Sequence, residues 1–249
     1  MKVVSFNLRV DTSYDKRDRF QFRKGLILDK LEAERPDWIG FQECGEAMAD
    51  FLRRHLTDYM WLGCGRGPDF DGENNMLGFL RSRWEPIACD TFWLSPTPHV
   101  PGSRYEEQSP CPRVCTHALL RDMEKGGLYH FYNTHLDHES DSARVLGAQA
   151  ILKRIDRDLQ DWVCPVLLMG DMNAFPDSPP IEAFRQWGFR DDTDGIPNTF
   201  HDYLRRPDVP RIDYILTKDF PAAQTQPWKD TLHELPLSDH YPVCAQYSL

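Results

Sequence analysis

The sequence lacks several features that would place it in a specialised class of protein. Its seven cysteines form no Cys-x-x-Cys pair, which excludes zinc-ribbon spacing, and their odd number and scatter favour reduced, mostly buried thiols. No apolar run approaches the roughly 20 residues of a membrane span. Polar residues also interrupt the N-terminal segment before it reaches the length that a secretory signal needs. We therefore expect a cytoplasmic protein without a membrane segment.

Positive charge is scarce as well. The chain has 29 Lys and Arg against 39 Asp and Glu, a formal net charge of −10, and a pI near 5.3. Tight, sequence-independent binding to duplex nucleic acid relies on Lys and Arg that release counterions from phosphates. The sequence shows no cluster of such residues with interleaved aromatic residues. The negative net charge therefore argues against a nuclease that acts on duplexes. It does not exclude one, because part of the negative charge would be neutralised locally if several carboxylates bound a shared metal ion.

No repeat, low-complexity tract or interdomain linker divides the chain. Its 249 residues, 41% of them hydrophobic, can bury one large core, and we predict a single domain over residues 1–249. Strands and helices alternate irregularly, which predicts two packed sheets with helices outside them. Apolar periodicity predicts helices near 20–34, 46–56, 140–161 and 180–187, and strands near 3–8, 38–43, 59–64, 75–80, 87–94, 114–121, 128–134, 166–169, 211–216, 221–228 and 242–247.

Charged and polar residues collect at the ends of the predicted strands. Glu43 and His135 each end a strand, and Asp171 and Asn173 follow the apolar run 166–169. Each residue alone fits a helix cap or a turn. Strand ends are also where a rigid sheet presents catalytic side chains to a cleft. Because the same placement recurs at Asp213 and is joined by the run Ser238-Asp239-His240, we predict one shared site.

Six short motifs follow one another along nearly the whole chain. They are Ser5-Phe6-Asn7-Leu8-Arg9, Gln42-Glu43, Asn133-Thr134-His135-Leu136, Gly170-Asp171-Met172-Asn173, Arg211-Ile212-Asp213-Tyr214 and Ser238-Asp239-His240-Tyr241-Pro242. In this order they resemble the signature blocks of the endonuclease/exonuclease/phosphatase superfamily. The resemblance implies an α/β fold of the deoxyribonuclease-I-like type. This fold is a four-layer α/β/β/α sandwich with the active site at one end of its two sheets.

The resemblance also implies a role for each matched residue. Glu43 resembles the metal-binding carboxylate, and Asn7 and Asp239 would complete an oxygen-rich shell of the kind that Mg²⁺ or Mn²⁺ prefers. Asn7 is also expected to lie within reach of the substrate. Asp171 resembles the carboxylate that orients or deprotonates the attacking water, and Asn173 would donate to a phosphoryl oxygen.

Two histidines complete the implied catalytic set. His240, paired with Asp213, would stabilise developing negative charge or act as an acid. His135 matches the second catalytic histidine, and Glu73 is similar to its acidic partner. A carboxylate beside an imidazole raises the pKa of that imidazole toward a cation, so we expect both histidines to be charged.

Four further residues have open assignments. Arg113 matches either an arginine that clamps phosphate in some members or a solvated arginine at a strand edge. His201, in Thr199-Phe200-His201, resembles part of a motif from a bacterial branch and is predicted to line the substrate pocket. His117 is expected at most to line the same pocket, without a catalytic role. His138 could form a metal pair with His135. In an extended loop, however, a three-residue spacing places the two side chains on opposite faces, so we predict no pair.

One motif departs from part of the superfamily. Abasic-site endonucleases have a motif similar to Trp-Asn-Val-Asp at the position where this chain has Phe6-Asn7-Leu8-Arg9. An arginine therefore replaces the additional metal-binding aspartate of that motif. This departure disfavours abasic-site repair. We expect a metal-dependent phosphoric ester hydrolase, a monomer, in which activated water attacks a phosphodiester or phosphomonoester of a small or single-stranded substrate. A DNA or RNA nuclease is the alternative, and a catalytically inactive binding module on the same fold is the alternative of another class.

Overall fold

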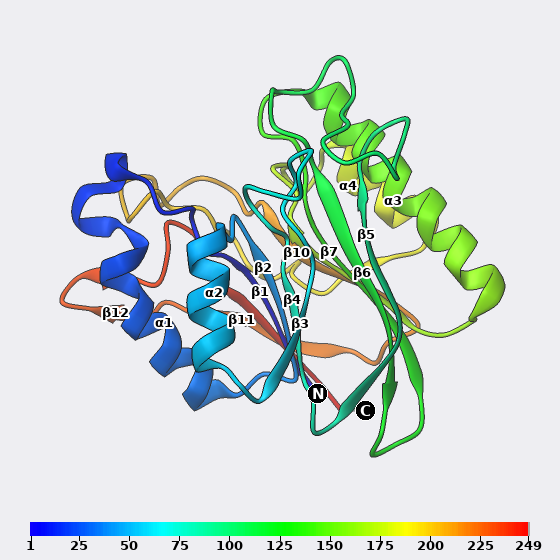
Figure 1. Cartoon of the computed structure of the whole chain (residues 1–249), viewed down its shortest axis with the longest axis horizontal. Helices are drawn as coiled ribbons and strands as arrows, with labels where there is room; N and C mark the ends of the chain where they lie inside the picture. Colours follow the sequence, from blue (N-terminus) through cyan, green and yellow to red (C-terminus); the bar gives the residue numbers. More distant parts are fainter. Residues whose placement is uncertain (249) are drawn as a thin grey trace.

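Two six-stranded sheets pack face to face between two pairs of helices in the computed structural model, which describes residues 1–248 (Figure 1). From left to right in Figure 1, the layers are α1 with α2, the first sheet, the second sheet, and α3 with α4. The predicted four-layer α/β/β/α sandwich is therefore confirmed. Within the described residues, no helix is long and apolar enough to cross a membrane.

The first sheet has the strand order β11-β14-β1-β2-β4-β3. Strands β1 and β2 are parallel, and all other neighbours are antiparallel. Its outer face is covered by two helices, and a short 3-10 helix, η1, precedes the first of them (Figure 1). The elements are β1 (Lys2–Asn7), η1 (Ser13–Asp18), α1 (Phe20–Glu34), β2 (Trp38–Gln42), α2 (Glu46–His55), β3 (Tyr59–Leu62), β4 (Leu77–Leu80), β11 (Ala223–Pro227) and β14 (Val243–Tyr247).

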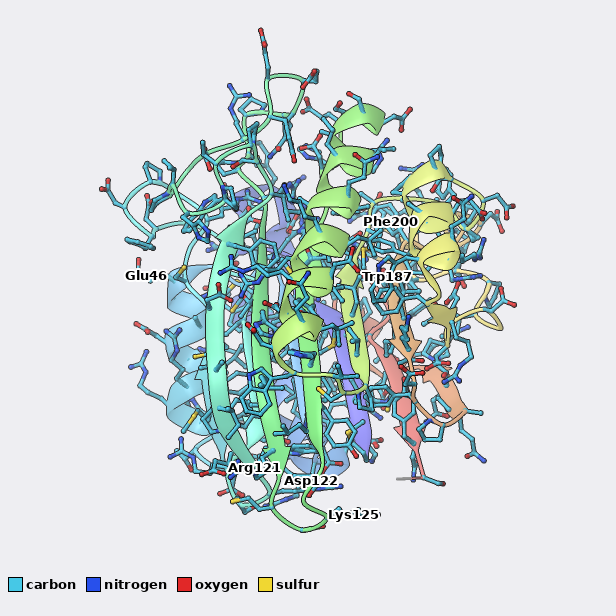
Figure 2. The ribbon with its side chains drawn as sticks, turned by 90° about the vertical axis from the view of Figure 1, so that its right-hand side faces the viewer. Glu46, Arg121, Asp122, Lys125, Trp187 and Phe200 are labelled. Carbon is cyan, nitrogen blue, oxygen red and sulfur yellow. The ribbon has the colours of Figure 1, made fainter. Side chains whose placement is uncertain are left out.

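The second sheet has the order β5-β6-β7-β8-β10-β9, and here β7 and β8 are the parallel pair. Figure 2 shows its long strands with α3 lying across their outer face, and it places Asp122 and Lys125 at the lower turn of the β6–β7 hairpin. The elements are β5 (Trp84–Trp93), β6 (Val114–Asp122), β7 (Leu128–His135), α3 (Asp141–Asp161), β8 (Val166–Asp171), α4 (Pro179–Trp187), β9 (Arg190–Asp191) and β10 (Asp213–Lys218), with a separate small hairpin of β12 (Thr231–Leu232) and β13 (Leu235–Pro236).

All the predicted helices and strands are present, with ends that differ by a few residues. The sequence patterns missed β9, β12 and β13, because two residues are too few to show a periodicity, and η1, because Ser13–Asp18 is a polar segment without an apolar period. One boundary matters for function. The strand predicted over 166–169 continues to Asp171, so this carboxylate is fixed by sheet pairing and not by a loop.

Apolar side chains fill the space between the sheets, but a few buried amides cross it. Asn133 of β7 donates its Nδ2 hydrogens to the carbonyl oxygens of Phe41 and Met76, at 2.9 and 3.0 Å. Gln42 of β2 donates from Nε2 to Oδ1 of the same Asn133 at 2.7 Å. Buried hydrogen bonds of this kind are costly to break, since each leaves an unsatisfied polar group. They fix the register of one sheet against the other directly beneath the strand ends.

Gly170 allows β7 and β8 to approach closely next to the predicted site. Its φ is 148°, and an added Cβ would lie 1.9 Å from the carbonyl oxygen of Thr134. We expect Gly170→Ala to lower the free energy of unfolding by about 2–3 kcal/mol, measured by urea denaturation. Gly25→Ala in α1 is the control, because nothing lies within 4 Å of its added Cβ and alanine favours a helix. Equal stability of the two variants would contradict this account.

Candidate active site

One edge of the sandwich collects polar strand ends from both sheets. Parallel β1 and β2 end there with Asn7 and the residue after Gln42, and parallel β7 and β8 end there with His135 and Asp171. Strand β10 runs antiparallel to β8, so it begins at this edge with Asp213 directly opposite Asp171. The segment 238–240 enters the same edge before β14. Topology therefore brings together the predicted residues Asn7, Glu43, His135, Asp171, Asn173, Asp213, Asp239 and His240.

Asp171 lies at the centre of this group and is almost fully buried. Its Oδ1 accepts the backbone N–H of Asn173 at 2.9 Å, which closes the turn after β8. Its Oδ2 accepts from Nδ2 of Asn7, across the sheet interface, at 2.9 Å. The same Oδ2 lies 3.5 Å from Nε2 of His135 and 3.8 Å from Nε2 of His240. One oxygen therefore holds the backbone, and the other faces the two histidines.

The environment of Asp171 and His240 shifts both groups away from their ordinary ionisation. Burial, with the neighbouring charge of Asp213, raises the pKa of Asp171 to about 7. Burial by itself would lower the pKa of His240. The carboxylates of Asp213, Asp171 and Asp239 outweigh that effect and raise the pKa of His240 to about 10. Nδ1 of His240 lies 2.8 Å from Oδ2 of Asp213, as the predicted pair requires. The site thus holds a basic carboxyl group beside a cationic imidazole.

The predicted partner of His135 is wrong. Oε1 of Glu73 accepts from Nη2 of Arg66 at 2.7 Å, and Nε2 of His135 accepts from Nδ2 of Asn173 at 2.9 Å. Burial, together with the positive charges of Arg113 and Arg66, holds the pKa of His135 well below its usual range. The expectation that both histidines are charged is therefore also wrong. Arg66 competes successfully for Glu73, and the site contains one neutral and one cationic imidazole.

Carboxylate oxygens gather on one side of the site. Glu43 has a left-handed φ of 55°, and its oxygens accept from Nδ2 of Asn7 at 3.1 Å and from the N–H of Val10 at 3.0 Å. Although burial opposes ionisation, these hydrogen bonds lower the pKa of Glu43. Burial and the nearby charge of Glu43 instead raise the pKa of Asp239. Crowded carboxylates of this kind are stabilised by a cation.

The donor set suits a hard divalent ion. Ligand atoms of Glu43, His135 and Asp171 all lie within 4.8 Å of one another, as do those of Asp171, Asp213 and His240. Oxygen ligands predominate near Glu43, and Mg²⁺ and Mn²⁺ prefer oxygen ligands. Glu43 therefore belongs to a group that fits such an ion, with Asp171 and His135 as the neighbouring ligand residues.

Arg113 provides positive charge on the other side of the site. It is 4% exposed, so the alternative of a solvated arginine is wrong. Its Nη2 donates to Nδ1 of His138 at 2.8 Å, but Nε and Nη1 have no hydrogen-bond partner within residues 1–248. Buried guanidinium groups are normally paired, because an unsatisfied donor is costly. Oδ2 of Asp137 lies 3.8 Å from Nε, close enough for an ion pair but too far for a hydrogen bond, so Nε and Nη1 remain available to an anionic group in the cavity.

These residues surround a cavity of about 360 Å³. His138 lines it together with His135, contrary to the predicted opposite faces, because Asp137 accepts the N–H groups of Glu139 and Ser140 and turns the chain back. Six lining residues have no cavity role in the sequence-based prediction, although Phe200 belongs to the motif Thr199-Phe200-His201: Arg9, Val10, Arg66, Cys111, Phe200 and Ile212. The lining residues are Arg9, Val10, Glu43, Arg66, Glu73, Cys111, Arg113, His135, His138, Asp171, Asn173, Phe200, Ile212, Asp239 and His240.

Two histidines considered for the pocket lie outside it. Phe200 forms a β-bridge with His240, and successive side chains of an extended segment point to opposite sides, so His201 turns away. Its ring packs on Tyr241 with centroids 4.0 Å apart, and the prediction that His201 lines the pocket is wrong. His117 lies on β6 and lines a different pocket, 3.0 Å from His130.

Comparison with known proteins agrees with this geometry. The model of the Endonuclease/Exonuclease/phosphatase family matches residues 4–240. The chain belongs to this family. Members of the family are typically hydrolases, and the predicted membership is confirmed.

Solved structures extend the family likeness to the whole fold. An endonuclease/exonuclease/phosphatase from Bacteroides vulgatus is 28% identical, with a TM-score of 0.92, and the match covers 100% of this chain and 98% of that one. The mannosyl-6-phosphatase Bt3783 of Bacteroides thetaiotaomicron is 23% identical, with a TM-score of 0.89 and all of both chains covered. D. rerio TDP2 complexed with a single-strand DNA product is 17% identical, with a TM-score of 0.74 and 100% and 99% coverage. The predicted deoxyribonuclease-I-like fold is thereby confirmed.

Proposed function

We propose that this protein is a Mg²⁺- or Mn²⁺-dependent phosphoesterase in which water attacks a small phosphate ester, with a phosphomonoester as the first candidate substrate. The position of Asp171 carries the proposal. Its Oδ2 faces neutral His135 and cationic His240, and its pKa is raised to about 7. A base with a pKa near the working pH is best suited to proton transfer.

Each group then has a physical task. Asp171 orients the attacking water and takes its proton, and His240 places positive charge beside the developing negative charge. Asn173 donates from Nδ2 to Nε2 of His135 and to the carbonyl oxygen of Leu136, so it holds the neutral ring of His135 in place, and the predicted donation to a phosphoryl oxygen would require one of these hydrogen bonds to break. Glu43 and Asp239 would hold the metal, which neutralises phosphate charge when bound.

Three observations favour a small monoester. Arg113 is buried, lines a cavity of about 360 Å³ and has two nitrogens without a hydrogen-bond partner in the described residues, which suits an oxygen-rich terminal phosphate. The net charge of −10 disfavours long polyanions. A mannosyl-6-phosphatase is one of the solved proteins with the same fold.

A nuclease that acts on single strands is the second candidate. The ring of Phe200 lines the cavity 5.0 Å from the ring of His240, and bases stack on such aromatic side chains. The TDP2 structure with its single-strand DNA product shares the fold. A binding module without activity is the least supported alternative, because a module would not need a buried charged pair such as Asp213 and His240.

Metal removal tests the proposed function directly. We expect excess EDTA to abolish hydrolysis of the best substrate in a panel of phosphomonoesters, phosphodiesters and oligonucleotides, and Mg²⁺ or Mn²⁺ to restore it. Glu43→Gln should require at least about tenfold more metal for half-maximal restoration. Glu46→Gln is the matched control, because Glu46 is exposed at the start of α2 (Figure 2). Full activity in excess EDTA would end the metal hypothesis, and cleavage of oligonucleotides alone would favour the nuclease.

Inhibition by inorganic phosphate tests the role of Arg113. Since hydrogen bonds to charged groups contribute about 1.5–3 kcal/mol, Arg113→Met should raise the inhibition constant of phosphate roughly 10- to 100-fold. Arg144→Met is the control, because Arg144 pairs with Asp141 on α3 and does not line the cavity. An unchanged inhibition constant in the Arg113 variant would show that phosphate binds elsewhere.

A further inference from the structure

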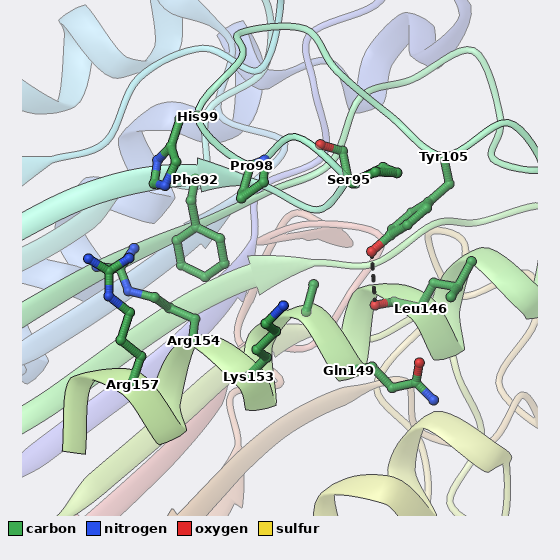
Figure 3. A pocket seen from close by; sticks show the side chains of 12 residues that line it. Phe92, Ser95, Pro98, His99, Tyr105, Leu146, Gln149, Lys153, Arg154 and Arg157 are labelled. Carbon is green, nitrogen blue, oxygen red and sulfur yellow. Dashed lines mark hydrogen bonds between the residues drawn. The ribbon is translucent and has the colours of Figure 1, made fainter. Parts of the chain in front are cut away.

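A second cavity, of about 400 Å³, lies between α3 and the irregular segment that joins β5 to β6 (Figure 3). It shares no lining residue with the candidate active site. The segment contributes Ser95, Pro98 and Tyr105 to one wall, and α3 contributes the opposite wall. Its volume is within the range of sites for small ligands, which is roughly 300–1,000 Å³.

One part of this cavity is apolar. The buried ring of Phe92 faces α3 with Pro98 beside it, and Leu146 lies at the other end of the cavity next to Tyr105 (Figure 3). The hydroxyl of Tyr105 donates to the carbonyl oxygen of Leu146 at 3.5 Å, which ties the segment to the helix at the far end. The space between these groups suits a ring-sized apolar body.

The α3 wall of the cavity is cationic. Lys153, Arg154 and Arg157 line the cavity from α3, and no acidic residue lines it. Arg154 is already paired: its Nη1 lies 2.7 Å from Asp90, and its Nε lies 2.8 Å from Asp158. Its guanidinium carbon lies 5.1 Å from the centroid of the Phe92 ring.

Lys153 and Arg157 are different from Arg154. Both are exposed, and neither side chain forms a hydrogen bond or ion pair with any residue in the described part of the chain. Figure 3 shows Lys153 pointing from α3 toward the opposite wall, and Arg157 at the same end as Arg154. Two unpaired cations therefore lie beside an apolar wall, where their positive potential would attract an anion.

We propose that this cavity is a binding site for a small organic anion with a ring-sized apolar body. The acidic group of the ligand pairs with Lys153 and Arg157, and its ring lies against Phe92. An apolar pocket with a few convergent polar groups is the usual form of a small-molecule site. The proposal does not depend on the catalytic one, because the two cavities are separate.

Calorimetric titration with naphthalene-2-sulfonate tests the site, because this ring-bearing anion contains no phosphate ester. We expect saturable binding to the whole chain and at least tenfold weaker binding of the neutral naphthalene-2-sulfonamide. The double variant Lys153→Gln/Arg157→Gln should lose at least tenfold in affinity, the loss expected from two charged hydrogen bonds. Neither side chain has a partner to lose, and unchanged thermal unfolding would verify the fold.

Two controls make the result specific. Arg53→Gln/Arg54→Gln removes the same charge from α2, whose exposed side lies on the opposite face of the sandwich, and should leave binding unchanged (Figure 1). Arg113→Met alters the active site and should also leave it unchanged. No binding at millimolar probe, equal losses in the two double variants, or loss of binding in Arg113→Met would each overturn the proposal.

Discussion

Replacing Asp171 by Asn is expected to lower kcat by a factor on the order of 10²–10⁴, the range for a positioned acid–base group. Asparagine retains an Oδ1 that can accept the N–H of Asn173, so the turn after β8 should survive. It removes the basic carboxyl group whose Oδ2 faces His135 and His240. Rates measured at saturating metal keep any weaker metal binding from limiting kcat. We expect the thermal midpoint to change much less than kcat, which steady-state kinetics and thermal unfolding would show.

The alternative is that Asp171 only closes a turn, and Asp191 offers a matched control for it. Oδ1 of Asp191 also accepts the N–H two residues ahead, from Thr193, at 2.9 Å, and Asp191 does not line the cavity. Asp191→Asn should reduce stability, since Asp191 pairs with Arg211, but it should leave kcat unchanged. A folded Asp171→Asn enzyme that retains more than about a tenth of the normal rate would end the catalytic assignment.

Replacing His240 by Ala is the second change with a large expected effect, again a loss in kcat on the order of 10²–10⁴. The imidazole is held by Asp213 at 2.8 Å and kept cationic by the surrounding carboxylates. Asp213→Asn should therefore also slow the reaction, because Asp213 is the carboxylate that contributes most to the raised pKa of His240. Since the two residues act as one unit, the double variant should be hardly slower than His240→Ala.

His117→Ala is the control for this experiment. His117 is as deeply buried as His240, at 4% and 5% exposure, but it lines a different pocket. Its replacement should lower the unfolding temperature and leave kcat near the normal value. If the losses from His240→Ala and Asp213→Asn multiplied fully, Asp213 would have to act independently of His240, contrary to the geometry.

Sequence by itself determined the architecture and the grouping of the central residues. His135 and Asp171 end recognisable apolar strands, Glu43 directly follows one, and parallel neighbours end at the same edge of a sheet. These placements can be predicted from the sequence because the hydrophobic pattern determines which strands are buried. The buried strands in turn determine where the polar residues at their ends lie. The ordered motifs gave the family for the same reason.

Only the tertiary structure decided the partners and charges within the site. The motif for Glu73 could not show that Arg66 would pair with it, and so could not show that His135 stays neutral. The motif Thr199-Phe200-His201 likewise could not show that Phe200 and not His201 faces the cavity. Ion pairs, burial and side-chain direction depend on neighbours that loops bring from distant parts of the chain. The pKa of a buried group follows the sum of those neighbours, which no short motif contains.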